Sequence, residues 1–191
     1  MSNLQQIIQG RRSIGKVKSD PVSRVIIEKL IEAAVWAPSH HGTEPWKFIV
    51  LTGDGRRVLG QAYADIALSV QEGLTADERT EQQAKEIGKA YRSPVVIVAI
   101  CSPSDLPRVD RREEFAAVHA AVQNLLLAAH DCGLGAVWRT GAPAYHPIMK
   151  SAFNVAQHEE IVGLVYVGYP DMIKSDAKRT AGTAKTQWIE Q

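Results

Sequence analysis

The chain has 191 residues, 45% of them hydrophobic and 23% charged, which is typical of a globular protein with a sizeable core. Its 22 basic and 21 acidic residues nearly cancel to a net charge of +1, which argues against a general nucleic-acid-binding surface. The two cysteines, Cys101 and Cys132, lack CxxC or metal-ligand spacing, so we expect neither a disulfide framework nor a zinc site. No signal peptide or bilayer-spanning segment is recognisable, and we therefore expect a cytoplasmic protein without membrane contact.

The first third of the chain predicts two helices followed by a strand. Residues 3–13 indicate a short helix that ends near Gly10. Residues 19–38 indicate an amphipathic helix that ends at its final proline, because the ring cannot continue the hydrogen-bond ladder. Residues 46–52 (WKFIVLT) then predict a strand. The apolar stripe predicted for the second helix consists of Ile26, Leu30, Ala33 and Ala34.

The middle third predicts a polar helical region, a buried strand and a long apolar helix. Residues 56–91 become more polar toward their end, so we expect the second half to cover a surface or to move. Residues 93–102 (SPVVIVAICS) predict a strand buried on both faces. The helix that follows from Phe115 carries alanine, valine and leucine on nearly all sides, and such a helix must be buried nearly all round. A monomer of this size achieves that with difficulty, so we expect a subunit interface along it.

The last third predicts a helix end at Gly133 and a short strand within residues 132–141 (CGLGAVWRTG), then a helix at 147–154 and a central strand at 159–170. Residues from about 170 to 191 have almost no core pattern and predict a loose tail, or an arm that lies across a partner. Together the elements predict a single domain over residues 1–191. Its class is α+β (mixed α/β), with a central mixed sheet flanked by helices.

Three separated segments carry more polar and cationic side chains than chain reversal requires: Gly10–Ser13, Ala37–Trp46 and Ala136–Gly141. Arginine offers a planar charged fork suited to phosphate, and serine or threonine hydroxyls add weaker contacts. Each segment also has an ordinary structural reading, because paired arginines are usually solvated and a Trp-Arg pair usually packs beside the surface. His40 and His41 make a poor metal site, since adjacent strand residues point to opposite faces and no third ligand is suitably spaced.

Taken in order, these segments resemble the FMN-dependent nitroreductase family along nearly the full chain. RRS at residues 11–13 resembles that family's N-terminal flavin-binding signature. APSHHGTEPW at residues 37–46 resembles its APSxxNxQPW loop. Residues 120–141 resemble its central helix and the segment that returns to the flavin. The compact form of the last segment is closest to the small YdjA-type members.

The resemblance implies a nitroreductase-like fold and an intertwined homodimer with two FMN sites at its interface, each built by both protomers. One protomer would hold the flavin from its N-terminal signature, while the loop around Ser39 reaches in from the partner chain. Arg139 would be the favoured phosphate partner. No catalytic side chain and no metal is implied. The implied cofactor-binding residues are Arg11, Arg12, Ser13, Ser39, His40, Trp138, Arg139 and Thr140.

The chain departs from the family pattern at several positions. Gly42 and Glu44 stand where the family has asparagine and glutamine, so amide contacts expected there are lost or changed. Gly15, followed by Lys16, stands where many larger members place a lysine beside the reduced flavin. Trp36 stands where YdjA-type proteins have a basic residue, and it receives no cofactor role.

The implied activity is hydride transfer from NADH or NADPH onto flavin N5, followed by reduction of a nitroaromatic or quinone-like small-molecule acceptor in the same space, which is a ping-pong mechanism. No protein nucleophile is required, and His119 and Gln123 are expected to be satisfied polar groups of the core or the interface. Two other hypotheses stay open at this point. One is a flavin-binding protein for storage or sensing without substantial turnover. The other is an α/β interaction protein without a cofactor.

Overall fold

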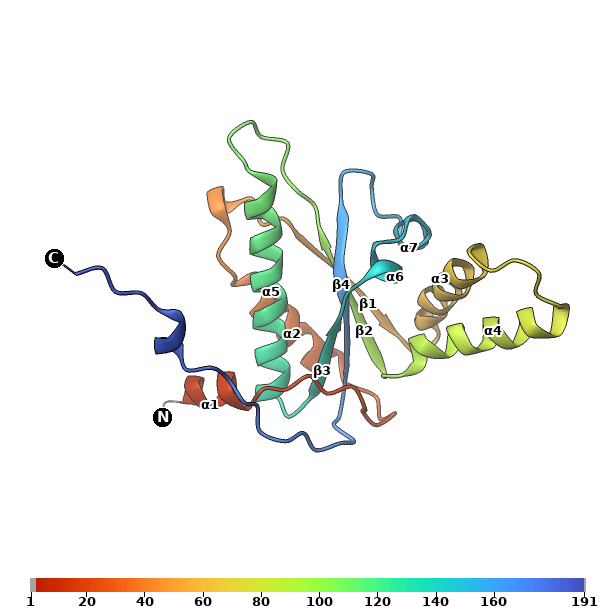
Figure 1. The fold of residues 1–191 in the computed structure, drawn as a ribbon, viewed down its shortest axis with the longest axis horizontal. Coiled ribbons are helices and arrows are strands. Elements are labelled where there is room, and N and C mark those ends of the chain that lie inside the picture. Colours follow the sequence, from red (N-terminus) through yellow and green to blue (C-terminus); the bar gives the residue numbers. More distant parts are fainter. Residues whose placement is uncertain (1–2, 191) are drawn as a thin grey trace.

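The computed structural model describes residues 3–190 and is an α+β arrangement of helices around one sheet (Figure 1). The four strands are β1 (Trp46–Thr52), β2 (Val95–Cys101), β3 (Gly135–Arg139) and β4 (Glu160–Gly168). The α-helices are α1 (Asn3–Gly10), α2 (Arg24–Val35), α3 (Arg56–Ser69), α4 (Ala76–Gly88), α5 (Arg111–Asp131), α6 (Ala142–Tyr145) and α7 (Pro147–Ala152). Short 3-10 turns lie at η1 (His40–Gly42), η2 (Gly53–Gly55), η3 (Lys89–Tyr91) and η4 (Gly182–Lys185).

The sheet has the strand order β1-β2-β4-β3, and each neighbouring pair is antiparallel. The mixed sheet predicted from the sequence is therefore corrected in one respect. Within residues 3–190, parallel pairing is limited to an isolated bridge between Ser13 and Ala136, where Ile14 N–H donates to the Ala136 carbonyl at 2.9 Å. This bridge places the segment after α1 against the outer edge of β3.

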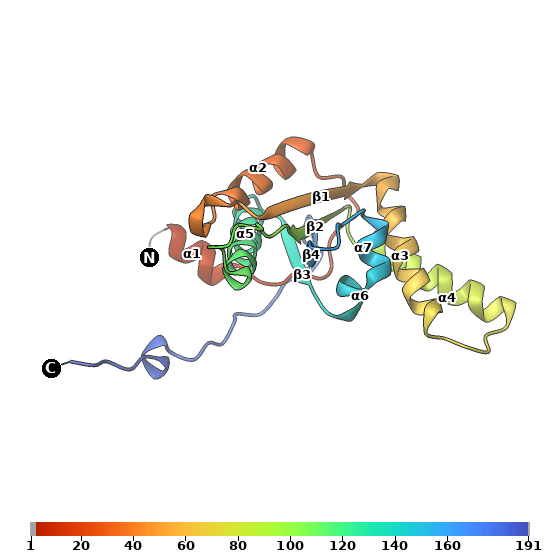
Figure 2. The same cartoon turned by 90° about the horizontal axis from the view of Figure 1, so that it is seen from above.

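Helices cover both faces of the sheet, and β2 lies fully buried between them (Figure 2). Because successive strand side chains alternate between faces, β2 contributes to two cores. Val95, Ile97 and Ala99 pack with residues of α2 and α5, whereas Val96 and Val98 pack with residues of α3, α6 and α7. A strand covered on both sides needs apolar residues at every position, which explains its continuous run of branched side chains.

The two long helices begin and pack somewhat differently from the prediction. Ser23 caps α2, and its Oγ accepts a hydrogen bond from Ile26 N–H at 3.4 Å. The buried stripe of α2 is Ile27, Leu30 and Ala34, while Ile26 and Ala33 are only half-buried. Helix α5 begins at Arg111, before the predicted Phe115, because the Asp110 carboxylate caps it by accepting from Arg112 N–H at 2.8 Å.

The rest of the chain buries only one side of helix α5. The side turned to the sheet and α2 consists of Ala117, Val118, Ala121, Val122, Leu125, Leu126 and Ala129. Ala116, His119 and Gln123 on another side are exposed. The apolar helix thus leaves one face without cover from residues 3–190.

Two parts extend away from the sheet. Helices α3 and α4 form a hairpin at one end of the molecule, and a capping box between Thr75 and Glu78 starts α4 (Figure 1). At the other end, the chain after Pro170 runs outward in an extended form that only η4 interrupts (Figure 2). Trp188 and Ile189, near its end, are exposed. No helix within residues 3–190 is long and apolar enough to cross a membrane.

Candidate functional site

The first candidate segment, Arg11–Ser13, lies between the end of α1 and the edge of β3. Arg11 N–H still donates to the Ile7 carbonyl at 3.0 Å, after which the chain extends to the Ser13–Ala136 bridge. Gly135 makes this contact possible, since a Cβ there would lie 2.6 Å from Ile14 Cγ2. The sequence therefore places a residue without a Cβ where any larger side chain would collide with Ile14.

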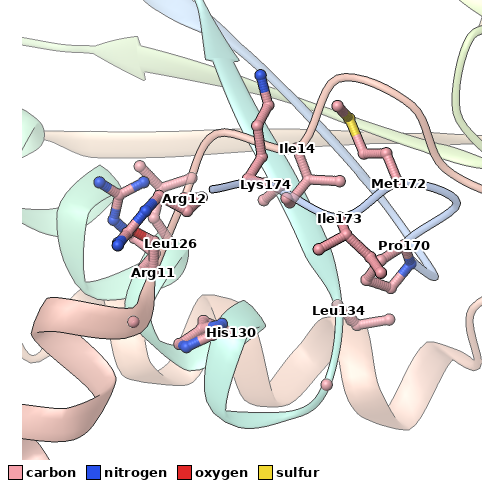
Figure 3. Close-up of a pocket in the computed structure, with 13 residues that line it drawn as sticks. Arg11, Arg12, Ile14, Leu126, His130, Leu134, Pro170, Met172, Ile173 and Lys174 are labelled. Atoms are coloured by element: carbon pink, nitrogen blue, oxygen red, sulfur yellow. The ribbon is translucent and has the colours of Figure 1, made fainter. Parts of the chain in front are cut away.

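Arg11 borders a cavity of about 340 Å³ at the C-terminal end of α5. Leu126 and His130 of α5 form one part of its wall. Figure 3 shows the Arg11 and Arg12 side chains lying together on one side of this cavity, across from Met172 of the C-terminal segment. Arg11 Nε is buried and has no hydrogen-bond partner within residues 3–190. A buried donor without an acceptor is rare in folded proteins, and a bound water, ion or ligand can supply the missing acceptor.

Arg12 is turned toward its own chain instead. Its guanidinium donates to the carbonyls of Gln9 (2.5 Å), Arg11 (3.0 Å) and Ser175 (3.3 Å). Asp176 Oδ1 lies 3.8 Å from Arg12 Nη2. Most donors of Arg12 are therefore satisfied by the chain, from the end of α1 and from the C-terminal segment.

A second cavity, of about 790 Å³, lies between α1 and the C-terminal segment. Arg11, Arg12 and Arg179 all line it. Arg179 was missed in the sequence because no motif surrounds it, and only the path of the C-terminal segment brings it to α1. A phosphate prefers such a group of guanidinium ions.

The segment at the end of β3 separates its side chains onto the two faces of the sheet. Trp138 faces α5, where its Nε1 donates to the Val162 carbonyl at 3.2 Å and its ring lies 5.6 Å from that of His119. Arg139 faces the other side, with its guanidinium 5.3 Å from the centre of the Tyr166 ring. Arg139 Nε is also buried without a hydrogen-bond partner in the described chain. Thr140 is exposed.

Ser39 and His40 belong to a strained connector between α2 and β1. His41, Gly42 and Glu44 all have positive φ angles, of 60°, 64° and 47°. For residues other than glycine this backbone region is costly, and such strain is concentrated at functional sites. Ser39 Oγ accepts from Glu44 N–H at 2.9 Å, which closes the connector on itself.

Glu114 fixes this connector to the start of α5. Its side chain is 1% exposed, and it accepts hydrogen bonds from Thr43 Oγ1 (2.5 Å) and Ser104 N–H (2.8 Å). His40 Nε2 lies 3.7 Å from Oε2 of the neighbouring Glu113 in the first turn of α5. The sequence did not identify Glu114, because a single glutamate among charged residues carries no signal of burial.

Within one chain, the predicted site residues do not come together. Arg11 lies at Leu126 and His130, whereas Ser39 and His40 lie at Glu113. Residues 113 and 126 are separated by about 20 Å along a helix, at a rise of about 1.5 Å per residue. Ser13 and residues 138–140 lie along the same strand, β3, or directly after it, because Ser13 bridges to Ala136. The connector with Ser39 and His40 lies at the N-terminal end of α5, away from them.

The structure offers little other chemistry. No group of three His, Cys, Asp or Glu side chains within residues 3–190 is placed to hold a metal ion. Burial raises the pKa of the Cys101 thiol to about 11, so that thiol is not an activated nucleophile. His119 and Gln123 are exposed, so their predicted place in the core is wrong. Their predicted place in an interface stays a prediction.

Relatives with curated names match nearly the whole chain. YfhC of Bacillus subtilis strain 168, named as an NAD(P)H nitroreductase, is 32% identical over 180 residues, which cover 94% of this chain and 90% of YfhC. YdjA of Escherichia coli K12, with the same kind of name, is 25% identical over 167 residues, which cover 87% of this chain and 88% of YdjA.

Solved structures share the fold. A nitroreductase-like family protein from Bacillus cereus has a TM-score of 0.85 and 29% identity, covering 100% of this chain and 98% of that one. A Desulfovibrio desulfuricans protein, described as a nitroreductase in complex with FMN, has a TM-score of 0.71 and 23% identity, covering 100% and 99% of the two chains. The second likeness concerns the fold alone.

The sequence profile of the nitroreductase family matches residues 8–169, which contain all three candidate segments. The family resemblance and the α+β fold predicted from the sequence are confirmed. The chain belongs to the nitroreductase family.

Proposed function

We propose that this protein is an FMN-dependent oxidoreductase that uses NADH or NADPH to reduce nitroaromatic or quinone-like acceptors. The names of its relatives support the nicotinamide donor, and a neighbour of the same fold was solved with FMN. The observation that carries the proposal is the pair of buried arginine nitrogens without partners, Arg11 Nε and Arg139 Nε. Both lie beside the edge of β3, in segments that resemble the family's flavin-binding motifs.

The residues present fit FMN at this edge. Arg11, with Arg12 and Arg179 beside it, would bind the phosphate, in place of the Arg139 favoured from the sequence alone. Ser13 would contact the ribityl chain, and Arg139 and Thr140 would approach the ring. Ala136 and Arg139 are separated by about 10 Å of strand, at about 3.3 Å per residue. That separation suits a cofactor whose phosphate and ring lie at opposite ends of a sugar chain.

When bound, FMN supplies the redox chemistry, taking hydride from NAD(P)H and passing electrons to a flat acceptor in a ping-pong cycle. The protein's own tasks are to bind and orient. Trp138 is held by its hydrogen bond to β4 and gives the site a rigid wall. No acid or base side chain of the chain is assigned a proton-transfer role.

We further propose that the active form is a homodimer. The exposed face of α5 includes Ala116, whose small side chain would allow close approach of a second helix. Pairing two α5 helices in opposite directions would bring Ser39 and His40 of one protomer toward Arg11 of the other. The residues after 170 would then lie across the partner as an arm, and residues 1–191 would form one domain that acts in the cytoplasm.

An absorbance spectrum of the purified protein, taken before and after anaerobic addition of NADH or NADPH, tests this function. We expect bound flavin to bleach and to regain its colour when a nitro compound is added. A yellow protein that neither nicotinamide bleaches would instead support storage or sensing. A colourless protein that takes up no FMN would support an interaction protein.

A further inference from the structure

A separate pocket of about 440 Å³ opens behind Arg139, on the face of the sheet away from α5. Its volume lies within the range of roughly 300–1,000 Å³ usual for small-molecule sites. Val137 of β3 and Leu164 of β4 line it with apolar side chains, and Pro143 and Ala144 of α6, the helix that follows β3, line another part. Trp138 also lines it, and the polar lining residues are Tyr63, Lys89, Arg92, Arg139, Thr140 and Tyr166.

The pocket carries an excess of positive charge. Lys89 is neutralised, because its Nζ lies 2.6 and 2.5 Å from the two carboxylate oxygens of buried Glu86. The exposed side chain of Arg92 makes no hydrogen bond or ion pair with any other residue of the described chain, and Arg139 Nε is buried without an acceptor. No carboxylate lines the pocket. Two guanidinium ions therefore face it without a counter-ion.

Two phenols add neutral donors. Tyr63 Oη and Tyr166 Oη lie 3.1 Å apart, so one hydroxyl hydrogen bonds the other and the second remains available. Burial raises the pKa of both tyrosines, and the nearby Arg139 and Arg92 only partly oppose that rise. Both hydroxyls stay protonated and can donate. Guanidinium ions and a phenol together form a site for an oxyanion such as a carboxylate or sulfonate.

We propose that this pocket binds the acidic group of the electron acceptor, so that the enzyme prefers flat aromatic acceptors that bear a carboxylate or sulfonate. This inference rests on the proposed function, because it takes the flavin ring to lie at Arg139 and Thr140. The acid would enter the pocket and leave the flat reducible part of the molecule over that ring. Arg92 would act as a specificity residue.

The charge of the pocket favours an anionic acceptor over a neutral one, because two guanidinium ions without a counter-ion attract a carboxylate or sulfonate. The apolar side chains of Val137 and Leu164 suit an aromatic ring that carries its acid directly.

The test compares 4-nitrobenzoate with 4-nitrobenzamide as acceptors of the FMN-loaded protein, and benzoate with benzamide as non-reducible ligands in calorimetric titration. The variants are Arg92→Gln, Arg92→Lys and Arg57→Gln. Arg57 is an exposed arginine of α3 that does not line the pocket. Arg57→Gln therefore removes the same charge as Arg92→Gln, but from a place outside the pocket. Comparing variants cancels the intrinsic difference in reactivity between the two nitro compounds.

We expect Arg92→Gln to lower the ratio of kcat/KM for acid over amide by about tenfold, the loss of one charge-assisted hydrogen bond. Benzoate affinity should fall by a similar factor, Arg92→Lys should retain much of both, and Arg57→Gln should keep the parental ratio. Added salt should weaken the preference for the acid.

Two results would overturn the inference. One is equal handling of acid and amide, with no benzoate binding. The other is an Arg92→Gln variant with an unchanged preference for the acid but a shifted midpoint potential of the flavin. That result would mean that the arginine charge acts on the flavin and does not bind the acceptor. The proposed function fails if neither nicotinamide reduces the flavin. The benzoate titration needs no turnover, so it would still show whether the pocket binds an acid.

Discussion

At the scale of single residues, Arg11 and Arg139 differ from the other arginines of this chain. Arg12, Arg24 and Arg112 find carbonyl or carboxylate partners at their own surfaces. Arg11 and Arg139 each keep a buried Nε without one. An unpaired buried donor costs about 1–3 kcal/mol, so a fold that retains two of them beside one strand edge is organised for something that binds there.

The two arginines should be separable by ligand. Arg11→Ala should weaken FMN binding by about 1.5–3 kcal/mol, the size of a charge-assisted hydrogen bond, but leave riboflavin, which has no phosphate, almost unaffected. Arg139→Ala should weaken both ligands. Fluorescence titration of apoprotein measures all affinities, and Arg57→Ala on the exposed surface of α3 is the control. If Arg11→Ala lost the same affinity for FMN and for riboflavin, Arg11 would not be the residue that binds the phosphate.

Glu159 connects the start of β4 to β1 through an ion pair with Lys47. The Lys47 ammonium, helped by a hydrogen bond from Ala156 N–H (3.0 Å), lowers the pKa of Glu159 to about 2 from an ordinary 4.5. Because the folded pKa is the lower one, its stabilisation is complete above pH 4.5 and is lost as the pH falls toward 2.

Glu159→Gln should therefore lower the free energy of unfolding by about 1–2 kcal/mol at pH 7, and by clearly less at pH 3. Urea unfolding of both proteins at the two pH values measures the difference. Glu81→Gln, at an exposed position of α4, should show no such pH-dependent loss. A loss that is the same at both pH values would mean that packing, and not ionisation, is the cause.

At the scale of elements, β4 is shaped by one glycine under the tryptophan of β3. Gly163 has φ of 152°, and a Cβ there would lie 2.1 Å from Trp138 Nε1. Trp138 can therefore lie across β4 and donate to the Val162 carbonyl only if residue 163 has no side chain. The indole in turn fixes the end of β3, where Arg139 and Thr140 begin the proposed site.

Gly163→Ala should destabilise the protein by about 2–4 kcal/mol, from backbone strain together with overpacking. The same change should displace Trp138 and alter the intrinsic tryptophan fluorescence of the folded protein. Urea unfolding and emission spectra provide the two measurements. Gly55→Ala, at φ −58° with no atom near its added Cβ, should be close to neutral. A stable variant with unchanged fluorescence would contradict this role for Gly163.

The sequence predicted β2 and α5 well because their patterns are long and strong. It predicted the stripe of α2 only in part. Leu30 and Ala34 are buried as predicted, but Ile27 is buried where Ile26 was predicted, because helical spacing allows either and only the packing of the core selects one. The direction of strand pairing was not readable either. Continuous burial is typical of parallel strands, but here helices cover both faces of an antiparallel sheet.

The candidate site was predictable where it lies in local motifs. RRS, APSHHG and VWRTG identify their own segments, but Arg92 and Arg179 join them only through the fold. No spacing along the chain relates Arg179 to Arg11, which are separated by most of the sequence. Long-range proximity of this kind depends on the path of the C-terminal segment and on the α3–α4 hairpin.

At the scale of the whole molecule, α5 sets the distance between the two halves of the site. Its first turn holds the connector through Glu114, and its last turns border the cavity at Arg11. The chain buries only one side of this helix and leaves Ala116, His119 and Gln123 exposed. A second copy that covers this face would complete both the core and the site.

Ala116→Glu should convert the proposed dimer into a monomer, because a carboxylate in a closely packed helix interface would be desolvated without a partner. Flavin content should fall with it, while the circular dichroism spectrum of the folded chain is kept. Sedimentation velocity and the flavin-to-protein absorbance ratio measure both effects. Ala84→Glu, on the exposed side of α4, is the control with the same change in charge. A dimeric, fully loaded Ala116→Glu protein would place the interface elsewhere.

The length of α5 also has a consequence for how the protein behaves at low abundance. If one protomer's Arg11 and the other's His40 share each flavin, mass action links cofactor retention to the association of the two chains. Stepwise dilution would then release yellow ligand and lower the rate per milligram, and added FMN would restore both. In a cell, the amount of working enzyme would rise more steeply than the amount of polypeptide made.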